Sequence, residues 1–400
     1  DVAIASGAWE LETGYEDAWS GTRGYPRTCT FHEGRLYFGG SATLPSTLFG
    51  SKVGQFFDFK ADEGLDDDAL QVTLTTDNVN AINAIKSGRD LQIFTSGAEF
   101  FLPQADLEPI TPSNVVVKSA TRRGAKENIR PQGAEGGTLF IQRQGKALRE
   151  MLFSDVELSY VANNISLLSS HLIIDPQKMA LRPATDTTEG DLLMIVNGTS
   201  TAGYRSASTG FAGGMACFMM NKSQNIIAPS FFKTDGDFID VAVDLDEIYV
   251  VVKRSIGGSD KYYLEIFDDD FTTDSAVQKT TGFSGTSYTG HSHLEGKTVA
   301  VIRDDIVDPS VAVSSGAVTT IAQPSTYIEA GLDFDVEVKT MPFEPKLASG
   351  SVQSQKRRIL EISPMLFKTQ NIAINNKDIP LDTYPLSGSG GVPTFTGTKK

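Results

Sequence analysis

The stretch Gly290 to Thr298, GHSHLEGKT, combines residue types that bind phosphates and metal ions. A phosphate-binding loop has the pattern G-x-x-x-x-G-K-[ST], in which four residues separate the glycines so that consecutive backbone N–H groups point at one anion. Five residues separate Gly290 from Gly296 here, and the β-branched run at 298–302 is typical of a strand rather than a helix. The spacing and the flanking sequence therefore argue against a nucleotide site.

His291 and His293 form the one pair of histidines with spacing suited to a metal ion. Residues two apart on a strand share a face, so both imidazoles could bind one Zn²⁺, and Glu295 continues the alternation. Structural zinc requires four ligands, which favours a polar loop with one packed histidine over a metal site. We expect no metal and no other cofactor, and we keep His291, His293 and Glu295 as weak metal-ligand candidates.

Acidic clusters and hydrolase motifs give no stronger indication of a functional site than the two histidines do. Three clusters could offer carboxylates to Ca²⁺, but none has the D-x-[DN]-x-[DN]-G spacing, and solvated turns are favoured at Asp66–Asp68, Asp235–Asp237 and Asp268–Asp270. The chain contains no G-x-S-x-G elbow, and its 50 acidic residues leave any glycosidase pair undefined. We expect no catalytic residues and a protein that is not an enzyme.

The charge balance restricts the partners. The chain of 400 residues has 35 Lys and Arg against 50 Asp and Glu, a net charge of −15. This balance opposes tight binding of DNA or anionic membrane, although DNA could slide past such a surface without adhering. Basic residues cluster only at 121–123 and 356–358, each typical of a solvated turn or of an ion-pair partner for an acidic neighbouring chain. No apolar run approaches 18 residues, so we expect no stable membrane insertion.

A strand–turn–strand unit recurs along the chain. Each unit has a short run of Leu, Ile, Val, Phe and Tyr, a Gly or polar turn, and a second such run. Equivalent positions in successive units lie 48 to 56 residues apart, at Leu36, Leu91, Leu139, Leu192 and Ile248. Propeller blades have four strands and a period of about 40–50 residues, so the repeat predicts an all-β fold with a β-propeller-like domain built from hairpins.

The spacing of the predicted strands changes near residue 285. We therefore predict a propeller-like domain at 1–285, with inserted loops near 180–285, and a smaller β-barrel or sandwich at 286–400. Strands of the second domain are predicted at 298–302, 310–313, 316–321, 334–340 and 358–363.

The best helical pattern covers 159–174, and the turn-rich tail at 386–397 suggests a loop or an interface arm. Cys29 and Cys217 are predicted to be buried thiols. The chain starts at Asp1 and ends at Lys400 without a closing element, so we expect a fragment whose second domain continues.

One segment resembles a known family. The segment 24–59 is similar to the tail nozzle proteins, also called tail tubular protein B, of short-tailed bacteriophages, through Pro26, Arg27, Phe31, Arg35, Leu36, Phe38, Gly39, Pro45, Ser51, Gly54, Phe57, Asp58 and Phe59. Weaker matches follow in the same order at 68–70, 80–82, 91–99, 110–112, 145–150, 165–172, 293–296, 331–332 and 339–342. The resemblance touches most of 24–345 and departs from the pattern at about 180–285.

The resemblance implies a virion structural protein located in the phage tail. Such proteins are propeller-containing subunits of a six-fold homo-oligomeric ring that retains double-stranded DNA and passes it during ejection. The implied partners are other copies of the chain, tail adaptor proteins, and tail fibres or spikes, and no catalytic residues are implied. Two alternatives stay open: a carbohydrate-binding or carbohydrate-active propeller that recognises the host cell surface, and a propeller that binds other proteins.

Overall fold

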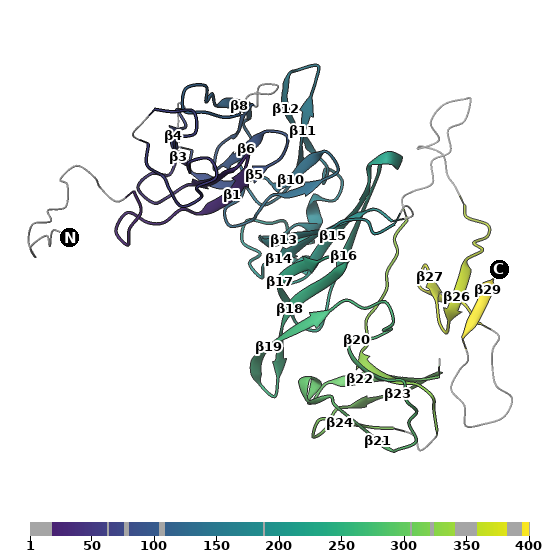
Figure 1. The fold of residues 1–400 in the computed structure, drawn as a ribbon. Helices are drawn as coiled ribbons and strands as arrows, with labels where there is room; N and C mark the ends of the chain where they lie inside the picture. The colour runs from purple at the N-terminus through teal and green to yellow at the C-terminus, as the bar shows by residue number, and fades with distance from the viewer. Residues whose placement is uncertain are drawn as a thin grey trace, which may run out of the picture. The chain divides into compact units, whose positions relative to one another are not determined.

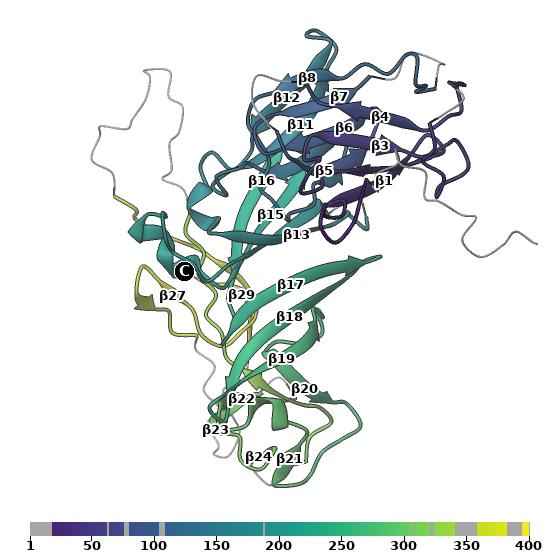
Figure 2. The same cartoon turned by 90° about the vertical axis from the view of Figure 1, so that its left-hand side faces the viewer.

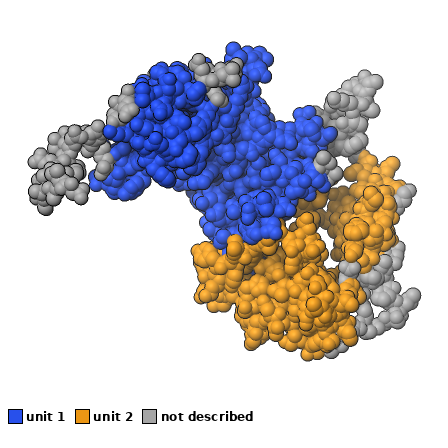
Figure 3. All heavy atoms as spheres, in the orientation of Figure 1, with its two compact units in different colours: residues 1–252 blue, residues 253–400 orange. Residues whose placement is uncertain are grey.

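The computed structural model describes residues 18–61, 64–75, 80–103, 109–186, 189–304, 306–320, 324–340, 358–381 and 394–399. The chain forms two compact units, residues 1–252 and 253–400 (Figure 3). This division lies earlier than the 285/286 boundary predicted from the sequence. The described residues contain strands and four short 3₁₀ helices, η1 (Ser170–Leu172), η2 (Ser206–Phe211), η3 (Lys222–Gln224) and η4 (Ser292–Leu294), with no α-helix. None of these helices could span a membrane.

Consecutive antiparallel sheets make up the first unit, and its fold is all-β and propeller-like. The first sheet contains β1 (Thr28–His32), β2 (Arg35–Gly39), β3 (Thr47–Gly50) and β4 (Leu70–Thr73). The second contains β5 (Ile82–Ser87), β6 (Leu91–Thr95), β7 (Glu99–Leu102) and β8 (Lys118–Thr121). The third contains β9 (Gln132–Ala134), β10 (Gly137–Ile141), β11 (Leu148–Ser154) and β12 (Ser159–Asn164).

The same meander continues in the next two sheets. The fourth sheet contains β13 (Pro176–Arg182), β14 (Asp191–Asn197), β15 (Met215–Asn221) and β16 (Ile226–Phe232) (Figures 1 and 2). A three-stranded sheet follows, with β17 (Asp237–Asp244), β18 (Glu247–Ile256) and β19 (Ser259–Ile266). The division between the two units falls within β18, so β19 belongs to the second unit. The five positions used to define the repeat all lie in the second strand of a sheet, so the predicted hairpins are confirmed at β2–β3, β6–β7, β10–β11, β14–β15 and β18–β19.

Burial differs between strands in a regular way. The second strands of the first four sheets are mostly buried, as in β6, where all five residues are buried, whereas β18 alternates between buried and more exposed residues. The fourth strands are far more exposed, as in β16, where no residue is buried. Strands buried on both faces read as continuous apolar runs, which is why the second strands gave the clearest sequence signal.

The core is a series of apolar clusters between neighbouring sheets. Side chains alternate across a strand, so adjacent residues face different neighbours. On β6, Ile93 joins a cluster with Tyr37 of the first sheet, and Phe94 joins one with Phe140 of the third. On β14, Ile195 packs with residues of the third sheet and Met194 with residues of β17 and β18. A register slip of one residue would exchange every such partner, so the alternation fixes the register.

The second unit contains a separate cluster. Its main sheet has the order β20 (Asp274–Lys279), β25 (Ile328–Leu332), β22 (Thr298–Arg303) and β23 (Ile306–Ala312). Three hairpin-like pairs accompany it, β21 (Ser287–Thr289) with β24 (Ala317–Thr319), β26 (Met365–Thr369) with β29 (Phe395–Thr398), and β27 (Ala373–Ile374) with β28 (Lys377–Asp378). Because β20 pairs with β25, residues before the predicted boundary belong to this sheet.

Four local predictions were wrong. Residues 159–164 of the predicted helix form β12, because pairing with β11 satisfies their backbone, and only 170–172 are helical. Residues 334–340 and 358–363, predicted as strands, form no strand and have no ladder partner among the described residues. Cys29 lies on the outward face of β1 and is exposed, whereas Cys217 is buried as predicted. The tail at 386–397 lies mostly outside the described residues.

Candidate functional site

The three metal-ligand candidates lie in a turn of the second unit, not on a strand. His291 precedes η4 and Glu295 follows it, while the positive φ angles of Gly290 (+110°) and Gly296 (+77°) allow the chain to turn on either side. His291 and Leu294 are fully buried, and Leu294 belongs to the apolar cluster of this unit. The segment is therefore part of this β domain.

The side chains of the turn do not converge on one point. His293 pairs through Nε2 with the carbonyl of Ser275 at 2.8 Å. The Glu295 carboxylate accepts the N–H groups of Ser315 (2.8 Å) and Gly316 (2.7 Å), which fixes the neighbouring loop. Among the described residues no three His, Cys, Asp or Glu side chains gather as metal ligands. Glu295 is thus a loop anchor, and the alternation argument fails because the segment is not extended.

His291 has an unusual environment for an imidazole. Neither ring nitrogen has a hydrogen-bond partner of ordinary geometry among the described residues, and the ring packs edge-on against Tyr288 with centroids 4.8 Å apart. Burial is the main cause that lowers the pKa of His291, and His293, stacked at 6.3 Å, lowers it further. The Ala330 and Tyr288 carbonyls oppose this shift in part. The folded state therefore favours the neutral ring.

Acidification is expected to destabilise the second unit through His291. Its pKa in the folded state lies below the ordinary value for histidine of 6.5, so below that pH the unfolded chain binds more protons. Stability from this group is complete above about pH 6.5 and falls as pH drops toward the folded-state pKa, by at most about 1.4 kcal/mol per pH unit. Urea denaturation from pH 7.5 to 5 should show a shallower loss in His291→Leu, whereas exposed His171→Asn should keep the wild-type slope. Equal slopes in His291→Leu and wild type would contradict this role.

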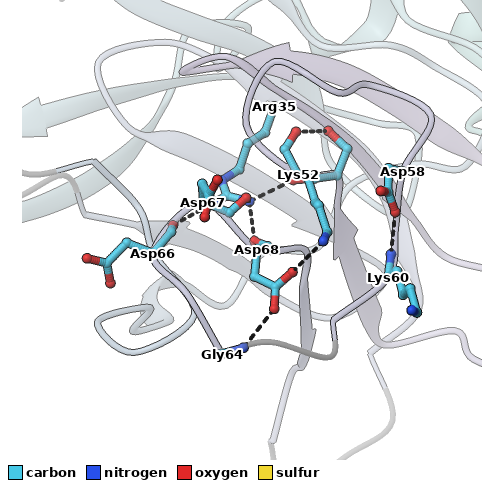
Figure 4. A network of polar contacts seen from close by, with 9 residues as sticks. Arg35, Lys52, Asp58, Lys60, Gly64, Asp66, Asp67 and Asp68 are labelled. Atoms are coloured by element: carbon cyan, nitrogen blue, oxygen red, sulfur yellow. Dashed lines mark hydrogen bonds and ion pairs between the residues drawn. The ribbon is translucent and has the colours of Figure 1, made fainter.

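A buried arginine organises the first sheet (Figure 4). Arg35, at the start of β2, is 1% exposed. Its guanidinium donates to the carbonyls of Ser51 (2.7 Å), Asp66 (2.8 Å) and Asp68 (2.5 Å), so it closes the long connection between β3 and β4 onto β2. The five fixed donors of a guanidinium suit several carbonyls at once, which an ammonium group cannot match.

In the cluster considered for Ca²⁺, the Asp68 carboxylate is paired within the protein. The Asp68 carboxylate pairs with Lys52 at 3.1 Å and accepts the N–H of Gly64 at 2.8 Å (Figure 4). The Asp66 and Asp68 carbonyls accept from Arg35, so part of the oxygen ligands available in this cluster is already used by the protein's own cations. Several residues of the resemblance therefore have a structural role in this loop.

Other residues of the resemblance are exposed. Phe57 is 94% exposed at the loop tip, and Phe31 is 61% exposed on β1. Phe31 packs edge-on against Phe56 with ring centroids 5.1 Å apart. These rings contribute little to the core of the first unit, and exposed aromatic side chains of this kind are enriched at protein interfaces.

An open groove of about 610 Å³ lies between β8 and β12, the outer strands of the second and third sheets. Each of these strands has a ladder partner on one edge only, β7 or β11, among the described residues. Such edges can pair with another extended segment. The lining residues on the β8 side include Ala120, Arg122 and Arg123, and those near β12 include Glu157, Val161, Ala162 and Asn163.

Positive charge dominates one wall of the groove. The side chains of Arg122 and Arg123 are exposed and have no ion-pair partner within the described ranges. Glu99 lies behind them, where it accepts from the Thr121 hydroxyl and, at 3.1 Å, from the Arg123 N–H. Burial raises the pKa of Glu99. Burial and the charge of Arg123 lower the pKa of Arg149, whose guanidinium donates to the Ala162 carbonyl at 2.9 Å.

Part of this site is visible in the sequence. The pair Arg122–Arg123 is indicated as a possible ion-pair partner for an acidic chain, but the sequence does not indicate the groove beside it. Arg35 and Glu99 were missed as buried charges. The sequence feature that could have indicated these buried charges is a single charged residue at the start of an otherwise apolar strand, as in RLYFG and EFFL.

Comparison with known proteins gives only distant structural likenesses. No protein-family model and no curated protein matches the sequence. The N-terminal domain of Nup159 is similar with a TM-score of 0.35 and 8% identity, over 75% of this chain and 77% of that one. The exo-beta-1,3-galactanase of Phanerochaete chrysosporium has a TM-score of 0.30 and 9% identity, over 82% and 96%. BamB of Moraxella catarrhalis has 0.21 and 11%, over 57% and 80%. Likeness at this level carries no argument about activity.

Proposed function

We propose that the chain is a structural subunit of the tail nozzle of a short-tailed bacteriophage. It would assemble with other copies into a six-fold ring that retains double-stranded DNA and passes it during ejection. The observation that carries this proposal is the long first block of the resemblance, residues 24–59. The proposed site of action is the virion tail, where tail adaptor proteins and fibres or spikes are the neighbours.

The arrangement of that block supports a subunit role. Arg35 and Ser51 hold the loop between β3 and β4, while Phe57 at its tip is 94% exposed. A loop that is rigidly anchored and carries an exposed aromatic residue is suited to contact another chain, because little ordering entropy is lost on binding. A closed ring repeats one heterologous contact around its axis, so such loops would meet a different surface of the next copy.

The charge of the chain is compatible with passage of DNA. A net charge of −15 gives a surface that repels phosphates, whereas a basic channel would hold DNA with salt-dependent affinity. This electrostatic account requires acidic residues on the channel wall. Finding the excess Asp and Glu on the outer wall of the ring would contradict it.

Cryo-electron microscopy of the full-length protein tests the proposal. We expect a closed ring with a channel wide enough for double-stranded DNA. Phe57→Ser should leave the denaturation midpoint unchanged and weaken assembly, while Val156→Ser, at a position that is 96% exposed, should affect neither. A protein that stays monomeric at all concentrations and with adaptor proteins present would overturn the proposal.

A second candidate is a carbohydrate-binding propeller that recognises the host surface. The exposed rings of Tyr25, Phe31 and Phe57 favour it, because sugars stack on aromatic platforms. Calorimetry with purified host polysaccharide distinguishes the two. Tight binding that is lost in Phe31→Ser and Phe57→Ser would support this second function, and no heat of binding would exclude it.

A further inference from the structure

An acidic segment of the second unit is complementary in charge to the groove. Residues 333–339, DFDVEVK, directly follow the buried strand β25, and all are exposed. Residues two apart on an extended chain share a face, so in a bound strand Asp333, Asp335 and Glu337 would lie on one side. Phe334, Val336 and Val338, which are 50%, 78% and 82% exposed, would lie on the other.

We propose that residues 333–339 of one copy bind in the groove between β8 and β12 of a neighbouring copy. This inference rests on the ring proposed above and names the two surfaces of its repeated contact. The acidic face of the segment would meet Arg122 and Arg123, and its apolar face would meet Ala120, Val161 and Ala162. The segment would add its backbone hydrogen bonds to an open strand edge.

Charge complementarity argues for a second copy as the occupant. Two chains with a net charge of −15 repel each other, so a contact between copies has to place basic residues against acidic ones. The groove wall with Arg122 and Arg123 is a local exception to the acidic balance, and the segment 333–339 is strongly acidic. A head-to-tail interface needs two different complementary surfaces on one chain, which these provide.

A charge-exchange experiment on the full-length protein tests this contact. Arg122→Glu/Arg123→Glu and, separately, Asp335→Lys/Glu337→Lys should each weaken self-association at least about tenfold by analytical ultracentrifugation. The chain carrying all four changes should recover most of the affinity, which a merely unfolded variant would not. Two control variants carry the same kinds of charge reversal at other exposed positions: Arg130→Glu/Arg205→Glu and Asp269→Lys/Asp270→Lys. Their self-association should be closer to that of the wild type than that of the two test variants.

Cross-linking identifies the chain to which the segment binds. In a Cys29→Ser background, a bismaleimide should join Asn163→Cys of one chain to Val336→Cys of another when the two single variants are mixed. Cross-links formed only within one chain carrying both changes would overturn the proposal. Self-association of both charge-reversal variants with the wild-type affinity would also overturn this proposed contact. If the wild-type protein still forms rings in that case, the nozzle function is not contradicted. A wild-type protein that never self-associates would remove the nozzle function itself.

Discussion

Replacing Arg35 by Met is expected to destabilise the first unit by about 3–5 kcal/mol, because it leaves buried carbonyl groups without a donor. The guanidinium serves three carbonyls, those of Ser51, Asp66 and Asp68, and lies 1% exposed, so water cannot replace it without opening the loop. Arg35→Lys should recover part of the loss, since it keeps a donor but cannot reach every acceptor. Urea denaturation followed by tryptophan fluorescence measures the change, because Trp19 packs on Phe38 of β2.

The matched control for Arg35 is Arg27→Met. The Arg27 side chain is 47% exposed and its pair with Glu127 is 3.6 Å long, so the change should stay within about 0.5 kcal/mol. Equal effects of the two substitutions would show that the carbonyl network does not stabilise the loop.

Replacing Glu329 by Leu is expected to cost the second unit a similar amount, about 3–5 kcal/mol. Glu329 is fully buried on β25. Its Oε1 accepts the N–H groups of Thr272 (3.0 Å) and Thr273 (2.7 Å), and its Oε2 accepts the Tyr327 hydroxyl. These bonds attach the start of β20 to β25, so their loss exposes the edge of the main sheet.

Glu329→Gln separates hydrogen bonding from charge. The amide oxygen can still accept the Thr272 and Thr273 N–H groups, so the loss should be clearly smaller than for Leu. Exposed Glu361→Leu should change stability by less than about 0.5 kcal/mol. Protection of the Thr273 amide in hydrogen exchange reports the local effect, and unchanged protection in Glu329→Leu would contradict the assigned role.

The sequence was most informative where burial is simplest. The second strands, such as β6 and β14, have apolar residues directed to both neighbouring sheets, and their runs and spacing revealed the hairpins and the all-β class. The spacing of Val161 and Ile165 matches a helical period, but residues 159–164 form a strand because β11 is available as a partner. Local periodicity does not reveal such a partner. The segment at 334–340 has a clear alternation but no ladder partner among the described residues, because alternation does not reveal whether a partner strand is available.

The candidate site was less predictable for a physical reason. A buried charge such as Arg35 or Glu99 is stable only when hydrogen-bond partners compensate for its lost hydration. Those partners come from distant positions in the sequence, so only the folded structure shows which ones they are. His291 and His293 are close in sequence, but a turn rather than a strand determines where their rings point. The basic pair at Arg122 was visible in the sequence, yet the groove beside it requires the juxtaposition of β8 with β12.

The alternation of core side chains between neighbouring sheets has a consequence for biosynthesis. Each apolar cluster in the first unit joins only sheets that follow one another in the chain, as Ile93 and Tyr37 do. A chain leaving the ribosome can therefore bury one sheet against the preceding one after roughly 50 more residues are made. In the described part of the first unit, an apolar second strand therefore need not wait for a distant carboxyl-terminal partner before its side chains are covered.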